Sequence, residues 1–164
     1  MTTKVAILGC GGRMGRNLLQ AAIESESIEL IGGLVRESST LKGIDAGELC
    51  GVGHKGMPVT ADINNLKAAD VFIDFTSIES TLENIKWCND NGKSIVIGTT
   101  GFTDQEVVKL KALSSDIPVV LAPNTSVGVN LLLKLVEMTA KVIGDDTDIE
   151  IFEAHHRFKK DAPS

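Results

Sequence analysis

A short apolar run that ends in glycines constrains the fold of this 164-residue chain more than any other feature. Residues 5–8 read VAIL, and the glycine-rich stretch GCGGRMGR follows at once over residues 9–16. A continuous aliphatic run is typical of a strand that is covered on both faces, as in a parallel sheet. Apolar residues then recur at helical spacing from Leu18 to Ile23. The pattern predicts a buried strand, a tight turn and a helix.

The rest of the chain repeats this alternation. Further strands are predicted at residues 28–35, 71–75, 94–97 and 119–121, and an apolar helix at 131–142. Thr76 with Glu79 and Thr103 with Glu106 fit the capping box that begins a helix. Strands that alternate with helices over short connections predict an α/β fold with a doubly wound parallel sheet. The glycine-rich residues 41–57 lack any period, and we interpret them as a surface loop.

The glycines of the turn stand at every third position, at Gly9, Gly12 and Gly15. The strict GxGxxG spacing is not met, because the sixth residue counted from Gly9 is Met14. Glycines still let a pyrophosphate approach the backbone, and the N-terminus of the following helix attracts anions. The sequence therefore predicts a Rossmann-like dinucleotide site here. A merely tight strand-to-helix turn is the alternative reading.

Three further stretches follow predicted strands and belong to the same edge of the sheet. Arg36 and Glu37 end the second strand, where an arginine suits the 2′-phosphate of NADP and an acid suits the ribose hydroxyl of NAD. Gly98, Thr99 and Thr100 follow the fourth strand, and residues 122–126 follow the fifth. Small residues of this kind also form ordinary turns. Their gathering at one edge favours a nicotinamide site.

Composition narrows the class of protein. The net charge of -6 argues against nucleic acid and membrane surfaces as partners, because both favour basic proteins. The apolar runs are too short to cross a bilayer. The three cysteines are widely spaced, which indicates reduced thiols and no zinc site. We expect a cytoplasmic protein.

The last residues, EAHHRFKKDAPS, concentrate positive charge in this acidic chain. His155, His156 and Lys159 follow a predicted strand at residues 147–153, whose polar and apolar residues alternate. Burial of so many unpaired charges is unfavourable, so the segment is a site for an anionic ligand or a solvated basic tail. A metal site is disfavoured, because the neighbouring cations would repel the ion.

The stretches GCGGRMGR, FIDFTS, VIGTTGF, APNTSVGVN and EAHHRFKKDAPS, in this order and spacing, resemble the dihydrodipicolinate reductase family from residue 4 to residue 164. The resemblance implies an enzyme of lysine (diaminopimelate) biosynthesis. Such an enzyme uses NADH or NADPH to reduce the cyclic imine derived from 4-hydroxy-tetrahydrodipicolinate to tetrahydrodipicolinate. It further implies a dicarboxylate substrate and a homotetramer.

By position, the resemblance implies that His155 is the proton donor with Lys159 as its cationic partner, and that His156 and Thr100 contact the substrate. Histidine suits the first role because its ordinary pKa lies near neutrality. The implied cofactor-binding residues are Gly9, Cys10, Gly11, Gly12, Arg13, Met14, Gly15, Arg36, Gly98, Thr99, Thr100, Ala122, Pro123, Asn124 and Thr125.

Two departures from the family pattern matter. Val35 replaces an acidic residue that is common in the family, immediately before the retained Arg36, which favours NADPH over NADH. The family motif also continues beyond Ser164, so we expect a fragment. Residues 1–126 would form the dinucleotide-binding domain, and residues 127–164 the incomplete start of an α+β substrate and tetramerisation domain. The alternative is a dinucleotide-binding module without catalysis.

Overall fold

The computed structural model describes residues 2–152, 154 and 157. The chain divides into two compact units, Met1–Ala122 and Pro123–Ser164. The division falls a few residues before the 126/127 boundary that the sequence suggests.

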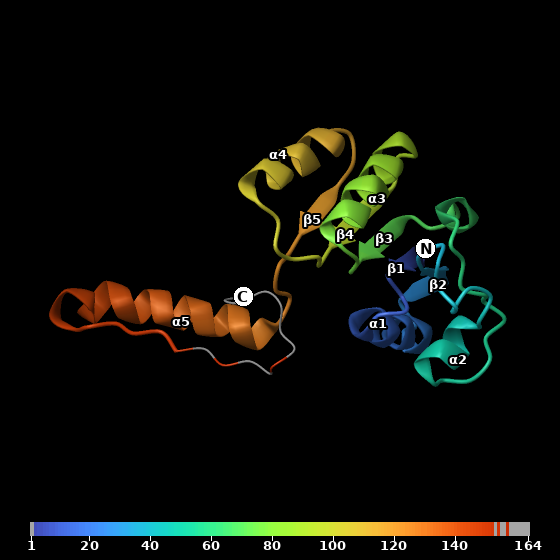
Figure 1. The fold of residues 1–164 in the computed structure, drawn as a ribbon. Helices are drawn as coiled ribbons and strands as arrows, with labels where there is room; N and C mark the ends of the chain where they lie inside the picture. The colour runs from blue at the N-terminus through green and yellow to red at the C-terminus, as the bar shows by residue number, and fades with distance from the viewer. Residues whose placement is uncertain (1, 153, 155–156, 158–164) are drawn as a thin grey trace. The chain divides into compact units, whose positions relative to one another are not determined.

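The first unit is built on a five-stranded parallel sheet with the strand order β2-β1-β3-β4-β5 (Figure 1). Its strands are β1 (Thr3–Leu8), β2 (Ile28–Leu34), β3 (Val71–Asp74), β4 (Ser94–Ile97) and β5 (Val119–Leu121). The chain starts at β1 near the middle, adds β2 on one side and then β3 to β5 on the other. The five strands predicted within residues 5–121 and the doubly wound α/β class are therefore confirmed.

Helices cover both faces of this sheet, and β1 supplies apolar side chains to both. Val5 and Ile7 pack in one core with Leu19, whereas Ala6 and Leu8 pack in a second core with Ile85. This two-residue alternation along a strand buried on both faces explains why the run VAIL has no polar member. The helices are α1 (Arg13–Glu24), α2 (Ala46–Cys50), α3 (Ile78–Asp90) and α4 (Asp104–Leu113), with a 3₁₀ turn at Ile63–Leu66.

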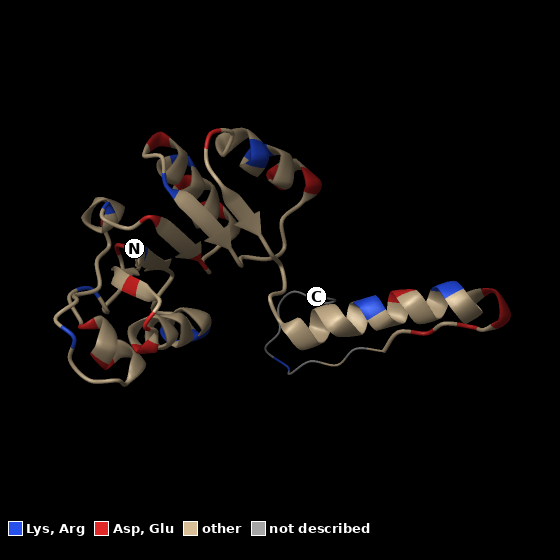
Figure 2. Ribbon diagram, turned by 180° about the vertical axis from the view of Figure 1, so that it is seen from behind, with Lys and Arg blue, Asp and Glu red and all other residues tan. Residues whose placement is uncertain are grey.

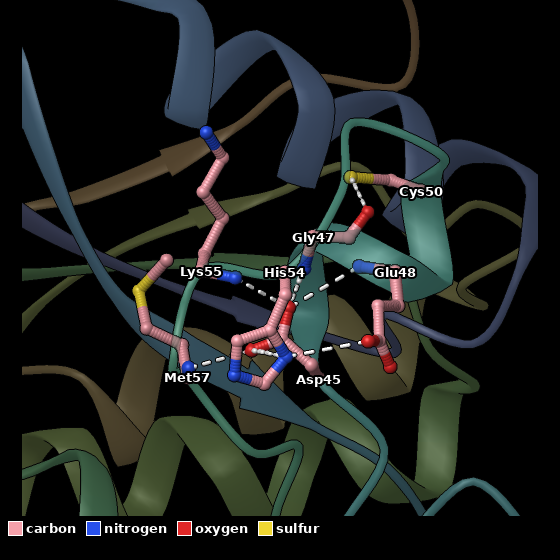
Figure 3. A network of polar contacts seen from close by, with 7 residues as sticks. All are labelled: Asp45, Gly47, Glu48, Cys50, His54, Lys55 and Met57. Carbon is pink, nitrogen blue, oxygen red and sulfur yellow. Dashed lines mark hydrogen bonds and ion pairs between the residues drawn. The ribbon is translucent and has the colours of Figure 1, made fainter.

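The prediction of an aperiodic surface loop at residues 41–57 is wrong. The segment contains α2 and is organised around Asp45, whose side chain is buried (Figure 3). Asp45 accepts hydrogen bonds from four backbone N–H groups, those of Gly47, Glu48, Lys55 and Met57, at 2.8–3.2 Å. The segment is ordered because the Asp45 carboxylate binds backbone groups on both sides of it. Apolar periodicity in the sequence does not reveal such a polar centre.

Of the two predicted capping boxes, one is confirmed and one is wrong. Thr103 and Glu106 form the reciprocal box at the start of α4. The cap of α3 is Ser77 instead of Thr76, and its side chain accepts from the N–H of Ser80. The hydroxyl of Thr76 is instead directed to Asp74, to which it donates at 2.6 Å.

The second unit consists of α5 (Val127–Ile143), a 3₁₀ turn (Gly144–Asp146) and an extended tail. Figure 2 shows that α5 carries little charge, and its apolar side chains such as Leu131, Leu132 and Leu133 are exposed. The strand predicted at 147–153 is absent over residues 147–152, because a strand requires a hydrogen-bonded neighbour and the described part of this unit offers none. Within the described residues, no helix is both long and apolar enough to cross a membrane.

Candidate functional site

Two clefts open beside the turn between β1 and α1. The larger cleft has a volume of about 760 Å³ and the smaller cleft about 260 Å³. Four residues line both clefts, namely Gly12, Phe75, Thr76 and Ser77, and we call them the shared wall. The larger cleft adds Gly9, Leu34, Val35, Arg36, Glu37, Ala61, Asp62, Ile63, Ser80, Glu83, Asn84 and Trp87, and the smaller adds Arg13, Met14, Gly15, Ile78, Gly98, Thr99 and Thr100.

The N-terminus of α1 lines these clefts with Gly12, Arg13, Met14 and Gly15. The first turn of any helix leaves backbone N–H groups without partners inside the helix. Each of the helices α2, α3, α4 and α5 has a capping side chain, whereas α1 has Gly12 at its N-cap and no acidic residue in its first turn. An uncapped helix start with free N–H groups and a positive dipole end is suited to bind an anion.

The three spaced glycines of the turn differ in how much room the structure leaves for a side chain. Gly9 has a φ of +77°, and a Cβ there would lie 2.5 Å from the carbonyl oxygen of Phe75. A Cβ on Gly15 would lie 2.3 Å from the carbonyl oxygen of Gly9, so α1 packs directly on the turn. At Gly12 the nearest atom would be 3.4 Å away, which is ordinary contact. Packing within the protein therefore explains Gly9 and Gly15, while Gly12 leaves its space to the two clefts.

Most of the predicted residues of the turn line the clefts, but two do not. Cys10 is fully buried, its sulfur packs against Gly33, and its N–H donates to the carbonyl of Leu34 at 3.1 Å. Burial raises the pKa of the Cys10 thiol to about 12, so it carries no charge at neutral pH. Gly11 also lines neither of these clefts. The turn offers a ligand its Gly12–Gly15 side.

The other predicted residues fall in different parts of the structure. Arg36 lines the larger cleft, and Glu37 beside it is paired with Lys42. Gly98, Thr99 and Thr100 line the smaller cleft, and the Phe75 ring fills the space that a side chain at Gly98 would need. Ala122 extends β5 by donating to the carbonyl of Ile97 at 3.0 Å.

Pro123, Asn124 and Thr125 belong to the second unit. There the side chain of Asn124 accepts from the N–H of Ser126 at 2.8 Å, just before α5 begins. His155, His156 and Lys159 lie outside the described residues, so their assigned roles stay predictions. Among the residues that are described, no group of His, Cys, Asp and Glu side chains is arranged to hold a metal ion.

A buried polar network lies behind the shared wall, and we call it the Asp74 network: Asp74, Thr76, Thr81, Asn84 and Thr99. Asp74 is fully buried at the end of β3. Its Oδ1 accepts from both the N–H (2.9 Å) and the hydroxyl (2.6 Å) of Thr76, and its Oδ2 accepts from the amide of Asn84 (2.9 Å). The hydroxyl of Thr99 reaches the same Oδ1 at 3.5 Å.

The hydroxyl of Thr99 joins this network to β4. It accepts from the N–H of Thr76 at 3.1 Å and from the hydroxyl of Thr81 at 3.0 Å. Burial raises the pKa of Asp74, while the hydrogen bonds from Thr76 and Asn84 oppose that rise. The segments after β3 and β4, which line the two clefts, are thus fastened to each other through buried groups.

The sequence reasoning missed Asp74, residues 75–77 after β3, and the parts of the larger cleft at residues 61–63 and 80–87. One signal was present for Asp74, since a charged residue ends the apolar run VFI within the stretch FIDFTS. A carboxylate that is placed at the end of a buried strand has to find donors there. No comparable signal marks residues 61–63, because they reach the cleft only through the course of the chain as it enters the 3₁₀ turn at Ile63–Leu66.

Family models and curated relatives show which proteins this chain resembles. The family model "Dihydrodipicolinate reductase, N-terminus" matches residues 3–125, and "Dihydrodipicolinate reductase, C-terminus" matches residues 128–164. The 4-hydroxy-tetrahydrodipicolinate reductase of Colwellia psychrerythraea is 63% identical over 164 residues, which are 100% of this chain and 61% of that protein. The protein of the same name from Hahella chejuensis is 52% identical over 163 residues, again 61% of its length. The chain thus spans about three fifths of the length of these curated relatives.

Similar solved structures include a dihydrodipicolinate reductase and other oxidoreductases of the same fold. A dipicolinate-bound dihydrodipicolinate reductase from Paenisporosarcina sp. TG-14 superimposes with a TM-score of 0.73 at 31% identity, covering 100% of this chain and 62% of that one. An oxidoreductase from Agrobacterium radiobacter, solved with NAD⁺, L-tartaric acid and magnesium, has a TM-score of 0.63 at 17% identity over 85% of this chain and 41% of its own; it shares the fold. On the match to residues 3–125, the chain belongs to the dihydrodipicolinate reductase family.

Proposed function

We propose that this chain is the cofactor-binding part of a 4-hydroxy-tetrahydrodipicolinate reductase that takes NADPH in preference to NADH. The observation that carries the proposal is the uncapped start of α1, which opens between two clefts in a chain of this family. A dinucleotide requires an anion site between two separate pockets, and the described residues fit that requirement.

The parts of the cofactor correspond to different residues. The N–H groups at the start of α1 would hold the pyrophosphate, and the uncrowded Gly12 would let it approach. The larger cleft would take the adenosine, with Arg36 as the donor to a 2′-phosphate. Glu37 is less available to a ribose hydroxyl, because Lys42 pairs with it. The smaller cleft, with Gly98, Thr99 and Thr100, would take the nicotinamide side.

The bound cofactor supplies a hydride, and the chain supplies the proton. Hydride addition to a conjugated imine leaves electron density on the neighbouring atoms, which then require protonation. The resemblance assigns this proton to His155, with Lys159 beside it and His156 and Thr100 toward the substrate. General acid catalysis of this kind contributes about 10²–10⁴-fold. A dicarboxylate substrate fits the cationic residues 157–160, and dipicolinate in the Paenisporosarcina protein is a ligand of that class.

A second candidate is a dinucleotide-binding module without catalysis. It is favoured by the position of both clefts and of the uncapped start of α1, which all lie within residues 9–100. The two candidates agree on the cofactor and differ only in turnover, so one pair of measurements separates them.

The first measurement is calorimetric titration of the 164-residue chain with NADPH and with NADH. We expect NADPH to bind more tightly by about tenfold, which one charged hydrogen-bond pair provides. Arg36→Ala should remove most of that difference and leave NADH binding nearly unchanged. Equal affinities in the wild type would contradict the NADPH preference, and no binding of either nucleotide would contradict the proposal.

The second measurement is NADPH oxidation with 4-hydroxy-tetrahydrodipicolinate as substrate. It uses a chain extended to the length of the relatives, with and without His155→Gln. We expect kcat to fall by about 10²–10⁴-fold, because the amide has no proton to give at neutral pH. Binding without turnover in the extended wild type would support the binding module. Full activity of the variant would show that the proton comes from elsewhere.

A further inference from the structure

We propose that the Asp74 network positions the shared wall, so that a ligand spanning both clefts meets them in one fixed arrangement. The inference rests on the proposed function, since it takes the spanning ligand to be a dinucleotide. Thr81 and Thr99 are then positioning residues, which act through Thr76.

Thr76 is the member of the network that stands in the shared wall. Three hydrogen bonds hold it from behind: its N–H and its hydroxyl donate to Asp74, and its N–H also donates to Thr99. The side chain of Thr76 also bounds the turn at Gly9, because its Cγ2 would lie 2.9 Å from a Cβ there. The position of the wall relative to the start of α1 is therefore set by Asp74 and Thr99.

The hydroxyls of Thr81 and Thr99 are not placed to bind a ligand themselves. Thr81 is fully buried and lines neither cleft, and it donates to Thr99. The hydroxyl of Thr99 already serves Thr76, Thr81 and Asp74. These two groups therefore act by fastening the segment after β4 to the segment after β3.

A ligand that fills only the larger cleft does not depend on this connection. A ligand that spans both clefts gains from their fixed relation, because binding of one half then places the other half at its own subsite. Loss of the connection should weaken binding of the ligand that spans both clefts and leave binding of the ligand in the larger cleft unchanged. A general loss of stability would not change the ratio of the two affinities.

The test is titration of the 164-residue chain with NADPH and with adenosine 2′,5′-bisphosphate, comparing wild type, Thr99→Val and Thr81→Val. Each change removes one hydroxyl and keeps the branched shape. We expect the affinity for NADPH to fall by about tenfold and that for the bisphosphate to change by less than about twofold. Thr99→Ser restores the hydroxyl and should bind NADPH like the wild type.

Thr103→Val is the matched control, because it removes the cap of α4 from a residue that lines neither cleft. It should lower the melting temperature and keep the ratio of the two affinities. Equal losses for both ligands in Thr99→Val and Thr81→Val, or no loss for either, would overturn the inference while leaving the proposed function intact. If circular dichroism shows that Thr99→Val does not fold, the ratio of NADPH to bisphosphate affinity in Thr81→Val decides the test. A wild type that binds the bisphosphate but not NADPH would overturn both proposals.

Discussion

Asp45 and Asp74 are both buried carboxylates of the first unit, yet their surroundings shift the pKa in opposite directions. Burial by itself raises the pKa of either group. Four backbone N–H groups outweigh burial at Asp45 and lower its pKa to about 2, whereas burial prevails at Asp74 and raises the pKa. Asp45 thereby stabilises residues 45–57 as a structural unit, and Asp74 holds a wall of the candidate site. The opposite pKa shifts of the two carboxylates follow from the donors that the fold brings to each.

Asp45→Asn should change how stability depends on pH. The folded pKa of about 2 lies below the ordinary value of 3.8, so the group stabilises the fold above pH 3.8 and loses that contribution as the pH falls toward 2. Urea denaturation should therefore give a clear gap between wild type and Asp45→Asn at pH 6, which narrows between pH 4 and pH 2. Asp116→Asn, at an exposed carboxylate that accepts from Ser115, should give little gap at pH 6. A gap for Asp45→Asn that is constant over this range would contradict the assignment.

At the level of elements, the turn between β1 and α1 has no room for a side chain at Gly15 but has room for one at Gly12. Gly15→Ala would bring a Cβ against the backbone of Gly9, and backbone there cannot move without displacing α1. We expect it to lower the melting temperature measured by circular dichroism.

Gly12→Ala has room within the protein but extends into both clefts, so it should keep the melting temperature and weaken NADPH binding by more than about tenfold. Loss of stability in both variants, with binding spared in Gly12→Ala, would contradict this division of roles.

The elements also show where sequence reasoning succeeds. Strands such as β4 and β5 were predicted with their observed bounds, because a short apolar run between polar turns is a local signal. The cap of α3 is one residue later than predicted, at Ser77, and the hydroxyl of Thr76 is directed to Asp74, a contact that only the tertiary structure shows. Residues 147–152 have the alternation of a strand, but a strand also requires a neighbour, and alternation carries no information about that.

For the whole molecule, the candidate site assembles segments that are far apart in the sequence. The turn after β1, the end of β2 and the segment after β4 were expected together, because parallel strands end at one edge. The segment after β3, residues 75–77, lines both clefts and was not expected. Residues 61–63 and 80–87 were not expected, since they come from a connection and from the side of a helix. The two units also differ in kind, as the first has two apolar cores and the second exposes the apolar side chains of α5.

The missing cap of α1 also has a consequence for how long the protein survives. Gly12 has no side chain to cap the opening turn of that helix, so among the described residues the turn keeps hydrogen-bonding capacity for a ligand. A nucleotide that uses this capacity binds the folded chain and not the unfolded one, so resistance to heat and to proteases rises with nucleotide concentration. A cell rich in reduced nucleotide would thus protect this protein from degradation, and one depleted of it would let the protein turn over faster.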